Sequence, residues 1–251
     1  MEKSVAGIWS TPKLAPMYPP FPIRYKNVSI LTTVYRTDPQ AIEKHIDAPV
    51  IRNGDFVMIH NYFMPDVEGM GVVEETNVMV GVKVNSKGVD HFGGFSTNLL
   101  ISSEVGLTQG REIHGQPKKM GNTKIKTTNN EIVAEVFRGE DLVSRVGMPV
   151  SNQAAQISEL EKYFPFRENI NHKVIRNIDG TQGINQITSR VLSDVVVKEC
   201  WRGPSLLKIE INESAPFHLL PVLETMESFY WKADFALVPG TILYDYLKAG
   251  L

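Results

Sequence analysis

The sequence predicts a mainly β (α+β) protein, an antiparallel β barrel or sandwich with a few flanking helices. Apolar, β-branched runs of strand length recur along all 251 residues. Turn-forming pairs such as Asn129-Asn130 and Gly139-Glu140 separate neighbouring runs, and strands do not alternate with long helices. Because 42% of the residues are apolar and no repeat or linker interrupts the chain, we expect one domain spanning residues 1–251.

The expected elements follow from local patterns of residues. Asp38 is expected to cap a short helix over 40–45, with Pro39 at its first position. Residues 92–104 fit either a strand or a helix, 151–168 suggest a loop with one helical turn, and 201–204 (Trp-Arg-Gly-Pro) suggest a turn. The ranges expected as strands are 28–35, 55–64, 72–84, 123–127, 131–138, 141–146, 174–178, 186–199, 206–211 and 241–247.

A proline-rich stretch precedes the first of these strands, over residues 10–26. Proline has no N–H to donate to a β ladder and favours extended backbone. We therefore expect an extended N-terminal arm that lies on the body of the protein or on a neighbouring subunit. Its prolines are Pro12, Pro16, Pro19, Pro20 and Pro22.

Composition excludes several functional classes. The net charge is −2 without a basic block, so we expect no nucleic-acid partner. No run of eighteen apolar residues exists, so no membrane span is expected. The single cysteine, Cys200, excludes an intrachain disulfide, and Met1 to Trp9 lack the pattern of a secretory signal, so the expected location is cytoplasmic. The six histidines show no metal-ligand spacing, and we expect no metal site.

Two adjacent lysines, Lys118 and Lys119, follow Pro117 in a segment that begins at Gly110 and ends at Gly121. Pro117 biases the preceding residue away from helical angles, so we expect an extended segment in which neighbouring side chains face opposite ways. Burial would lower the lysine pKa from about 10.4 and free a nucleophilic amine. From the residues alone, a solvent-exposed surface turn remains the alternative.

Five motifs together resemble the acetoacetate decarboxylase family, in the order expected over residues 12–248. The resemblance is strongest in the lysine segment. The motifs are Val34-Tyr35-Arg36-Thr37-Asp38, Gly69-Met70-Gly71 followed by Glu75, Gly110-Arg111-Glu112-Ile113 followed by Pro117-Lys118-Lys119-Met120-Gly121, Trp201-Arg202-Gly203-Pro204, and Tyr244-Asp245-Tyr246-Leu247.

The resemblance implies a fold, a reaction and a set of residues. It implies the family's antiparallel β barrel, a homo-oligomer and decarboxylation of a small β-keto acid without metal or organic cofactor. Lys118 would form a Schiff base with the ketone, and Glu75 would orient the substrate or move a proton. Acetoacetate decarboxylase is itself a known example of a lysine activated by its surroundings, so this role comes from the resemblance. Without it, Glu75 would fit a surface strand equally well.

Three positions depart from the family pattern. Val28 follows Asn27 where acetoacetate-cleaving members have arginine, and His60 stands where they have a second glutamate. His114 lies four residues before Lys118, on the same side if the segment is extended. The two histidines are interpreted either as core residues or as a proton-transfer pair near Lys118.

These departures keep other functions open. One is a Schiff-base aldolase, dehydratase or hydratase acting on a larger keto substrate, and another is a non-catalytic ligand-binding protein. Further candidates for substrate binding, proton transfer or support of the lysine are Lys119, Gln116 and Arg111.

Overall fold

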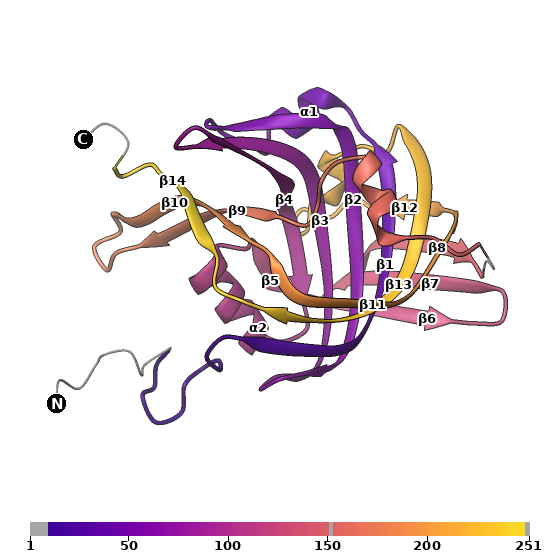
Figure 1. Ribbon diagram of the computed structural model, residues 1–251, viewed down its shortest axis with the longest axis horizontal. Helices are drawn as coiled ribbons and strands as arrows, with labels where there is room; N and C mark the ends of the chain where they lie inside the picture. The colour runs from indigo at the N-terminus through magenta and orange to yellow at the C-terminus, as the bar shows by residue number, and fades with distance from the viewer. Residues whose placement is uncertain (1–9, 151–152, 249–251) are drawn as a thin grey trace.

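A computed structural model describes residues 10–150 and 153–248, and most of them lie in two β-sheets (Figure 1). The larger sheet has ten strands in the order β11-β13-β1-β2-β3-β4-β9-β10-β14, with β5 paired to β4. Its strands are β1 Ile23–Arg36, β2 Val50–Val67, β3 Gly71–Ser86, β4 Val89–Ile101, β5 Lys118–Met120, β9 Asn169–Arg176, β10 Gln182–Arg190, β11 Leu192–Pro204, β13 Glu224–Leu237 and β14 Thr241–Asp245.

The second sheet is the predicted meander of short strands, completed by a fourth strand in the order β12-β8-β7-β6. Apolar side chains on one face of β7 and β8, such as Ala134 and Val146, pack against Leu31 of β1. The small sheet therefore covers one face of the large sheet. Its strands are β6 Asn122–Thr127, β7 Glu131–Arg138, β8 Asp141–Pro149 and β12 Leu206–Ile209.

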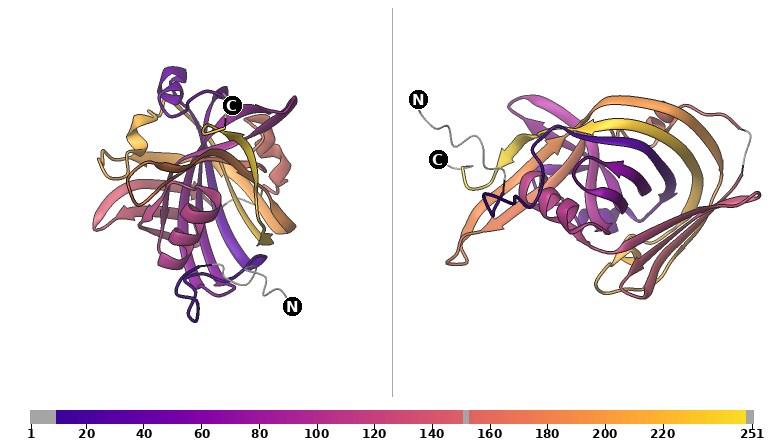
Figure 2. Two further views of the ribbon diagram at one scale, coloured as in Figure 1. Left: turned by 90° about the vertical axis from the view of Figure 1, so that its left-hand side faces the viewer. Right: turned by 90° about the horizontal axis from the view of Figure 1, so that it is seen from below.

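The long strands of the large sheet carry apolar side chains on both faces. Along β3, Val78 and Val80 face the core shared with the small sheet, whereas Met79 between them faces a second core with Ile30 and Leu99. The sheet is strongly curved in the right-hand view of Figure 2. The second core, on the face away from the small sheet, is where the cavities described below lie.

Short helices connect the strands. Helix α1 (Pro39–Glu43) begins as predicted, because the Asp38 side chain accepts a hydrogen bond from the backbone N–H of Gln40. Helix α2 (Glu104–Gln109) is capped by Ser103. Single 3-10 turns lie at Ile157–Lys162, within the predicted loop, and at Phe217–Leu219. Among the described residues, no helix is long and apolar enough to span a membrane.

Two details of the predicted fold were wrong, and one ambiguous range is now assigned. The large sheet is mixed, because β4 pairs in parallel with both β5 and β9. Residues 201–204, predicted as a turn, instead form the end of strand β11. Because β11 lies at the edge of the sheet, Pro204, which has no N–H to donate, is tolerated at its end. The ambiguous range 92–104 is strand β4 up to Ile101, followed by the start of α2.

The proline-rich arm is shorter than predicted, because Ile23 to Lys26 already belong to β1. Within the described part of the arm, Tyr18 is buried against the body, and its hydroxyl donates a hydrogen bond to Glu112 Oε2 over 2.7 Å. Residues 1–9, on which the expectation about a secretory signal rests, lie outside the described residues.

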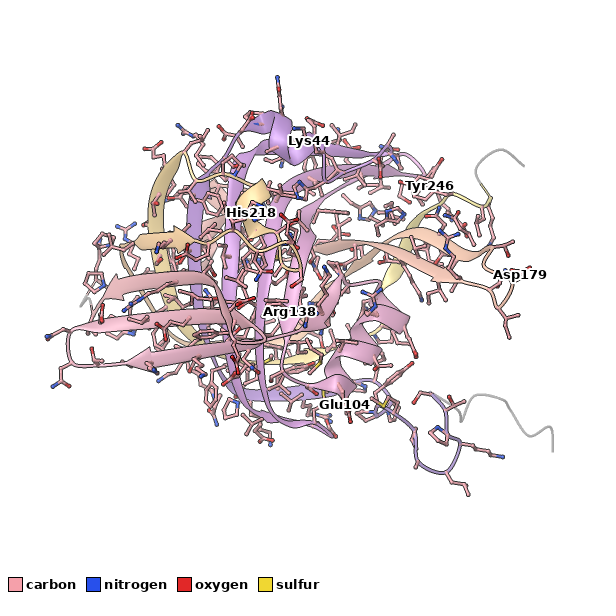
Figure 3. The ribbon with its side chains drawn as sticks, turned by 180° about the vertical axis from the view of Figure 1, so that it is seen from behind. Lys44, Glu104, Arg138, Asp179, His218 and Tyr246 are labelled. Atoms are coloured by element: carbon pink, nitrogen blue, oxygen red, sulfur yellow. The ribbon has the colours of Figure 1, made fainter. Side chains whose placement is uncertain are left out.

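One hairpin extends away from the two-sheet body. Figure 3 shows Asp179 at the tip of the turn between β9 and β10, far from the strands of the small sheet. The inner ends of these two strands return to the body, where Asn169 hydrogen-bonds to Ser96 of β4. The hairpin therefore brings Asn169 and Arg190 to the edge of the second core.

Candidate active site

The lysine segment is partly helical. Helix α2 continues into a π-helical turn, Gly110–His114, which ends where Gly115 adopts a left-handed φ of 75°. The chain then enters β5 at Lys118, beside Leu99 of β4. The predicted extended segment was therefore wrong before Lys118, and His114 does not share a strand face with the lysine.

The two adjacent lysines occupy opposite environments. Lys118 is buried, and its Nζ lies 3.0 Å from Glu75 Oε2. Lys119 is exposed, and its Nζ donates a hydrogen bond to the carbonyl of Ser214 over 2.8 Å. The alternation along β5 thus places Lys118 inside the protein and Lys119 outside it, as predicted.

Lys118 and Glu75 line a small cavity of about 40 Å³, which has space for only a few water molecules. Gly110 packs directly against the lysine: a Cβ atom at this position would lie 2.6 Å from both Cδ and Cε of Lys118. The π-helical turn therefore fixes the path of the lysine side chain. The cavity is lined by Tyr25, Tyr62, Met64, Glu75, Gln116, Lys118, Arg190, Leu192, Phe235 and Leu237.

Burial lowers the pKa of Lys118 below its usual range, and the positive charge of Arg190 acts in the same direction. The Glu75 carboxylate opposes this shift, but removal of the ammonium group from water is the larger effect. Arg190, at the end of β10, was not among the residues predicted from the sequence. It forms no ion pair within the described residues, and its buried Nε has no hydrogen-bond partner there.

Two further predicted residues lie close to Lys118. Gln116 is buried, lines the cavity and donates from Nε2 to Asn169 Oδ1 over 3.3 Å. Arg111 is exposed and lies outside the cavity, where its Nη1 donates to the backbone carbonyl of Lys118 over 3.1 Å. Gln116 is therefore placed to contact a ligand, whereas Arg111 holds the backbone of β5.

Comparison with known proteins decides the family. The model of the family described as acetoacetate decarboxylase matches residues 8–247. The chain belongs to the acetoacetate decarboxylase family. Membership places it among the carboxy-lyases. The acetoacetate decarboxylase of Clostridium botulinum (strain Eklund 17B / Type B) is 30% identical to it over 99% of both chains.

Solved structures agree with this assignment. The crystal structure of acetoacetate decarboxylase from Legionella pneumophila is 25% identical and covers 98% of both chains with a TM-score of 0.87. The enduracididine biosynthesis enzyme MppR, complexed with pyruvate, has a TM-score of 0.78 at 16% identity, and the match covers 95% of this chain and 98% of that one. At this low identity, the similarity to MppR shows a shared fold only.

In this member of the acetoacetate decarboxylase family, His114 is buried but does not line the Lys118 cavity. Its ring packs edge-on against Phe21, with centroids 5.3 Å apart. Burial, assisted by the charges of Arg190, Lys118 and Lys173, lowers the pKa of His114 to about 2. The ring is therefore neutral at ordinary pH.

His60 lies three strands away from Lys118 in the same cross-strand row, which runs from β2 through Asn77 and Leu99 to β5. It lines a second, larger cavity. The described residues give no contact between the rings of His60 and His114. His60 lines the larger cavity and His114 lines neither cavity, and their interpretation as a proton-transfer pair stays a prediction.

Val28, interpreted from the sequence as a departure from the family pattern, lies outside the Lys118 cavity. Val28 is completely buried among apolar side chains, and Arg24 is exposed and pairs with Glu68 at the surface over 3.5 Å. The guanidinium in the Lys118 cavity belongs to Arg190, at the end of β10. No local motif marks this residue, since the pairing of β10 with β9 and of β9 with β4 brings it to the site.

Proposed function

We propose that this protein decarboxylates a β-keto acid of the acetoacetate type through a Schiff base on Lys118. The observation that carries the proposal is the placement of a buried lysine, with lowered pKa, 3.0 Å from Glu75 in a small cavity that also contains Arg190. Such a site holds an amine with a lowered pKa beside a carboxylate and a cation, which are the groups that this reaction needs.

The reaction begins when the neutral Nζ of Lys118 attacks the ketone carbon. Loss of water from the carbinolamine gives an iminium ion, which draws the electron pair of the neighbouring C–CO₂⁻ bond toward nitrogen. CO₂ leaves, the resulting enamine takes a proton from solvent on carbon, and water hydrolyses the new iminium ion, so that one solvent proton is consumed per turnover. The products are the ketone, CO₂ and the free lysine, and no redox partner is consumed.

Arg190 and Glu75 have complementary roles in this proposal. Arg190 has no carboxylate partner among the described residues, so its guanidinium is available to bind the substrate carboxylate. Glu75 accepts a proton when the Lys118 ammonium becomes an amine, and returns it during hydrolysis. Gln116, beside both in the cavity lining, is expected to orient the substrate.

The test is trapping of the Schiff base with borohydride in the presence of acetoacetate, with CO₂ release measured in parallel. We expect a reduced adduct located on Lys118 by peptide mass spectrometry, together with CO₂. An adduct without CO₂ would favour aldol or dehydration chemistry on the same lysine. Absence of any adduct, or an adduct on another lysine, would remove the proposal.

A further inference from the structure

The small Lys118 cavity opens onto a larger one. The larger cavity has a volume of about 450 Å³, within the range of ligand pockets, whereas the Lys118 cavity has about 40 Å³. Four residues line both, so the two cavities adjoin: Tyr62, Arg190, Leu192 and Phe235. A substrate of the size of acetoacetate would occupy the first cavity and leave the second without a function.

The wall of the larger cavity is mainly apolar. Ile30, Met79, Phe166 and Trp231 contribute aliphatic and aromatic surface from four separate segments. On the outer side, Val197 of β11 completes the wall. A surface of this kind fits an aryl or long alkyl group, because burial of apolar atoms is its main source of binding energy.

Among the polar side chains that interrupt this wall, two lie side by side on neighbouring strands. His60 of β2 and Asn77 of β3 are directly paired in the sheet register, and both are buried. The carboxamide of Asn77 makes no hydrogen bond within the described part of the chain, and its Oδ1 has no partner. A buried amide without partners is costly, so this position favours a polar group supplied by a ligand.

The tautomer of His60 follows from its neighbours. Trp231 Nε1, which can only donate, lies 3.0 Å from Thr32 Oγ1, and that oxygen lies 2.8 Å from His60 Nδ1. If His60 also donated to Thr32, the threonine hydroxyl proton would have no acceptor among the described residues. Thr32 therefore donates to Nδ1, and the His60 proton is on Nε2, the nitrogen that has no protein partner there.

We propose that the larger cavity binds the distal substituent of the substrate, and that this substituent is an aryl or long alkyl group bearing an oxygen atom that hydrogen-bonds to His60 and Asn77. The inference rests on the proposed function, since the substituent belongs to the 3-oxo acid that reacts with Lys118. It names the substrate class as bulky 3-oxo acids with a distal oxygen.

The test compares three methyl ketones that share the reactive carbonyl: acetone, 4-phenylbutan-2-one and 4-(4-hydroxyphenyl)butan-2-one. Calorimetry measures their binding to the protein, and borohydride trapping measures their adducts. We expect the phenyl group to strengthen binding roughly 30-fold over acetone, from the apolar area it buries. The hydroxyl group should add roughly threefold to tenfold, from one hydrogen bond.

Variants locate the effect. Val197→Trp fills the larger cavity and should weaken binding of both aryl ketones at least tenfold relative to acetone. Val196→Trp, whose side chain is exposed and outside the cavity lining, is the matched control and should leave the ratio unchanged. His60→Phe should remove the preference for the hydroxyl group over the plain phenyl group.

The outcomes separate this inference from the proposed function. Equal binding of acetone and the aryl ketones, or unchanged ratios in Val197→Trp, would overturn the inference even if Lys118 formed adducts with all three. Because calorimetric binding does not require a covalent bond, the absence of adducts would count against the Schiff-base function alone. Tighter aryl binding that Val197→Trp abolishes would support the inference in either case.

Discussion

The two adjoining cavities differ in how their polar groups are arranged. Around Lys118, a buried amine, a carboxylate and a guanidinium line a cavity of about 40 Å³. Around His60, a cavity of about 450 Å³ has a mainly apolar wall with a few polar side chains, including Arg167 and the shared Arg190. The small, charged cavity is suited to one covalent reaction, whereas the larger cavity is suited to selecting which molecule undergoes it.

This separation has a physical reason. Charge interactions strengthen in a small space without water, so the groups that tune Lys118 must lie close to it. Recognition of an apolar substituent depends on area and shape and can be built further away. A family that keeps the first arrangement can therefore change substrate through the second. His60, which departs from the family pattern, lies in the second cavity.

The largest effect should come from Lys118→Arg, which breaks the charged cavity. Arginine keeps the positive charge but cannot act as an amine nucleophile, so we expect decarboxylation to fall roughly 10⁴-fold or more and trapping to disappear. Steady-state CO₂ release measures the rate. Lys119→Arg is the matched control, because Lys119 is exposed, and its rate should stay within about twofold. Equal losses in both variants would contradict the assignment.

The burial of His60 in the larger cavity predicts that the stability of the protein depends on pH. Burial lowers the pKa of His60 from 6.5 to about 4, so between these values the unfolded chain binds a proton that the folded protein does not. Stability should therefore fall as the pH drops through this interval, by about 3 kcal/mol from His60. His114 acts in the same direction to lower pH.

Urea unfolding at pH 7 and pH 4.5 measures this loss, and His60→Gln should reduce it. The difference between the two pH values, and not the stability at either, is the readout, because the substitution also changes packing. An identical pH dependence in the variant and the parent protein would show that His60 is accessible to protons in the folded state.

The two cavities also differ in how far the sequence predicts them. The strands of the meander and the opposite orientations of Lys118 and Lys119 follow from local patterns, whereas burial of Lys118 was expected only from the family resemblance. The π-helical turn Gly110–His114 was missed, because the extended prediction rested on Pro117, which restricts only Gln116. Gly115, a residue type that often ends helices, was the available signal for this turn. The Gly-Pro pair at 203–204 suggested a turn, but the end of an edge strand accepts proline equally well.

Long-range pairing could not be predicted from local patterns. The parallel pairs of β4 with β5 and β9 join segments that are far apart in the sequence, and they decide which side chains meet at Lys118. Arg190 reaches the site only through them. The large cavity depends on the curvature of the whole sheet and on the position of β11 beside β13, and neither follows from a local residue pattern.

Arg190→Met should sharpen the distinction between the cavities, because this residue lines both. Loss of the guanidinium should raise the KM for a 3-oxo acid roughly 30-fold, from one charged hydrogen bond. It should also raise the pKa of Lys118, since Arg190 helps to lower it, and so shift the rising limb of the pH–rate profile toward higher pH. Arg176→Met, on the surface of the neighbouring strand, is the control, and neither quantity should change.

Gly110→Ala should have the smallest effect and the most specific one. The backbone at Gly110 is right-handed helical, with φ of −63°, so alanine fits the conformation and should not destabilise the turn by itself. Its methyl group, however, would lie 2.6 Å from Cδ and Cε of Lys118 and displace the side chain within a cavity that has little free space. We expect the rate of decarboxylation to fall roughly tenfold, because small misplacements of a reacting group are costly.

Gly147→Ala in β8 is the matched control, since its new methyl group would meet nothing closer than 3.9 Å. Comparison of kcat and of the free energy of unfolding in the two variants separates placement of the lysine from general stability. Binding of an aryl ketone in the larger cavity should be retained in both. If Gly110→Ala kept full activity, the lysine would have an alternative path to the substrate, and the small cavity would be less rigid than its packing implies.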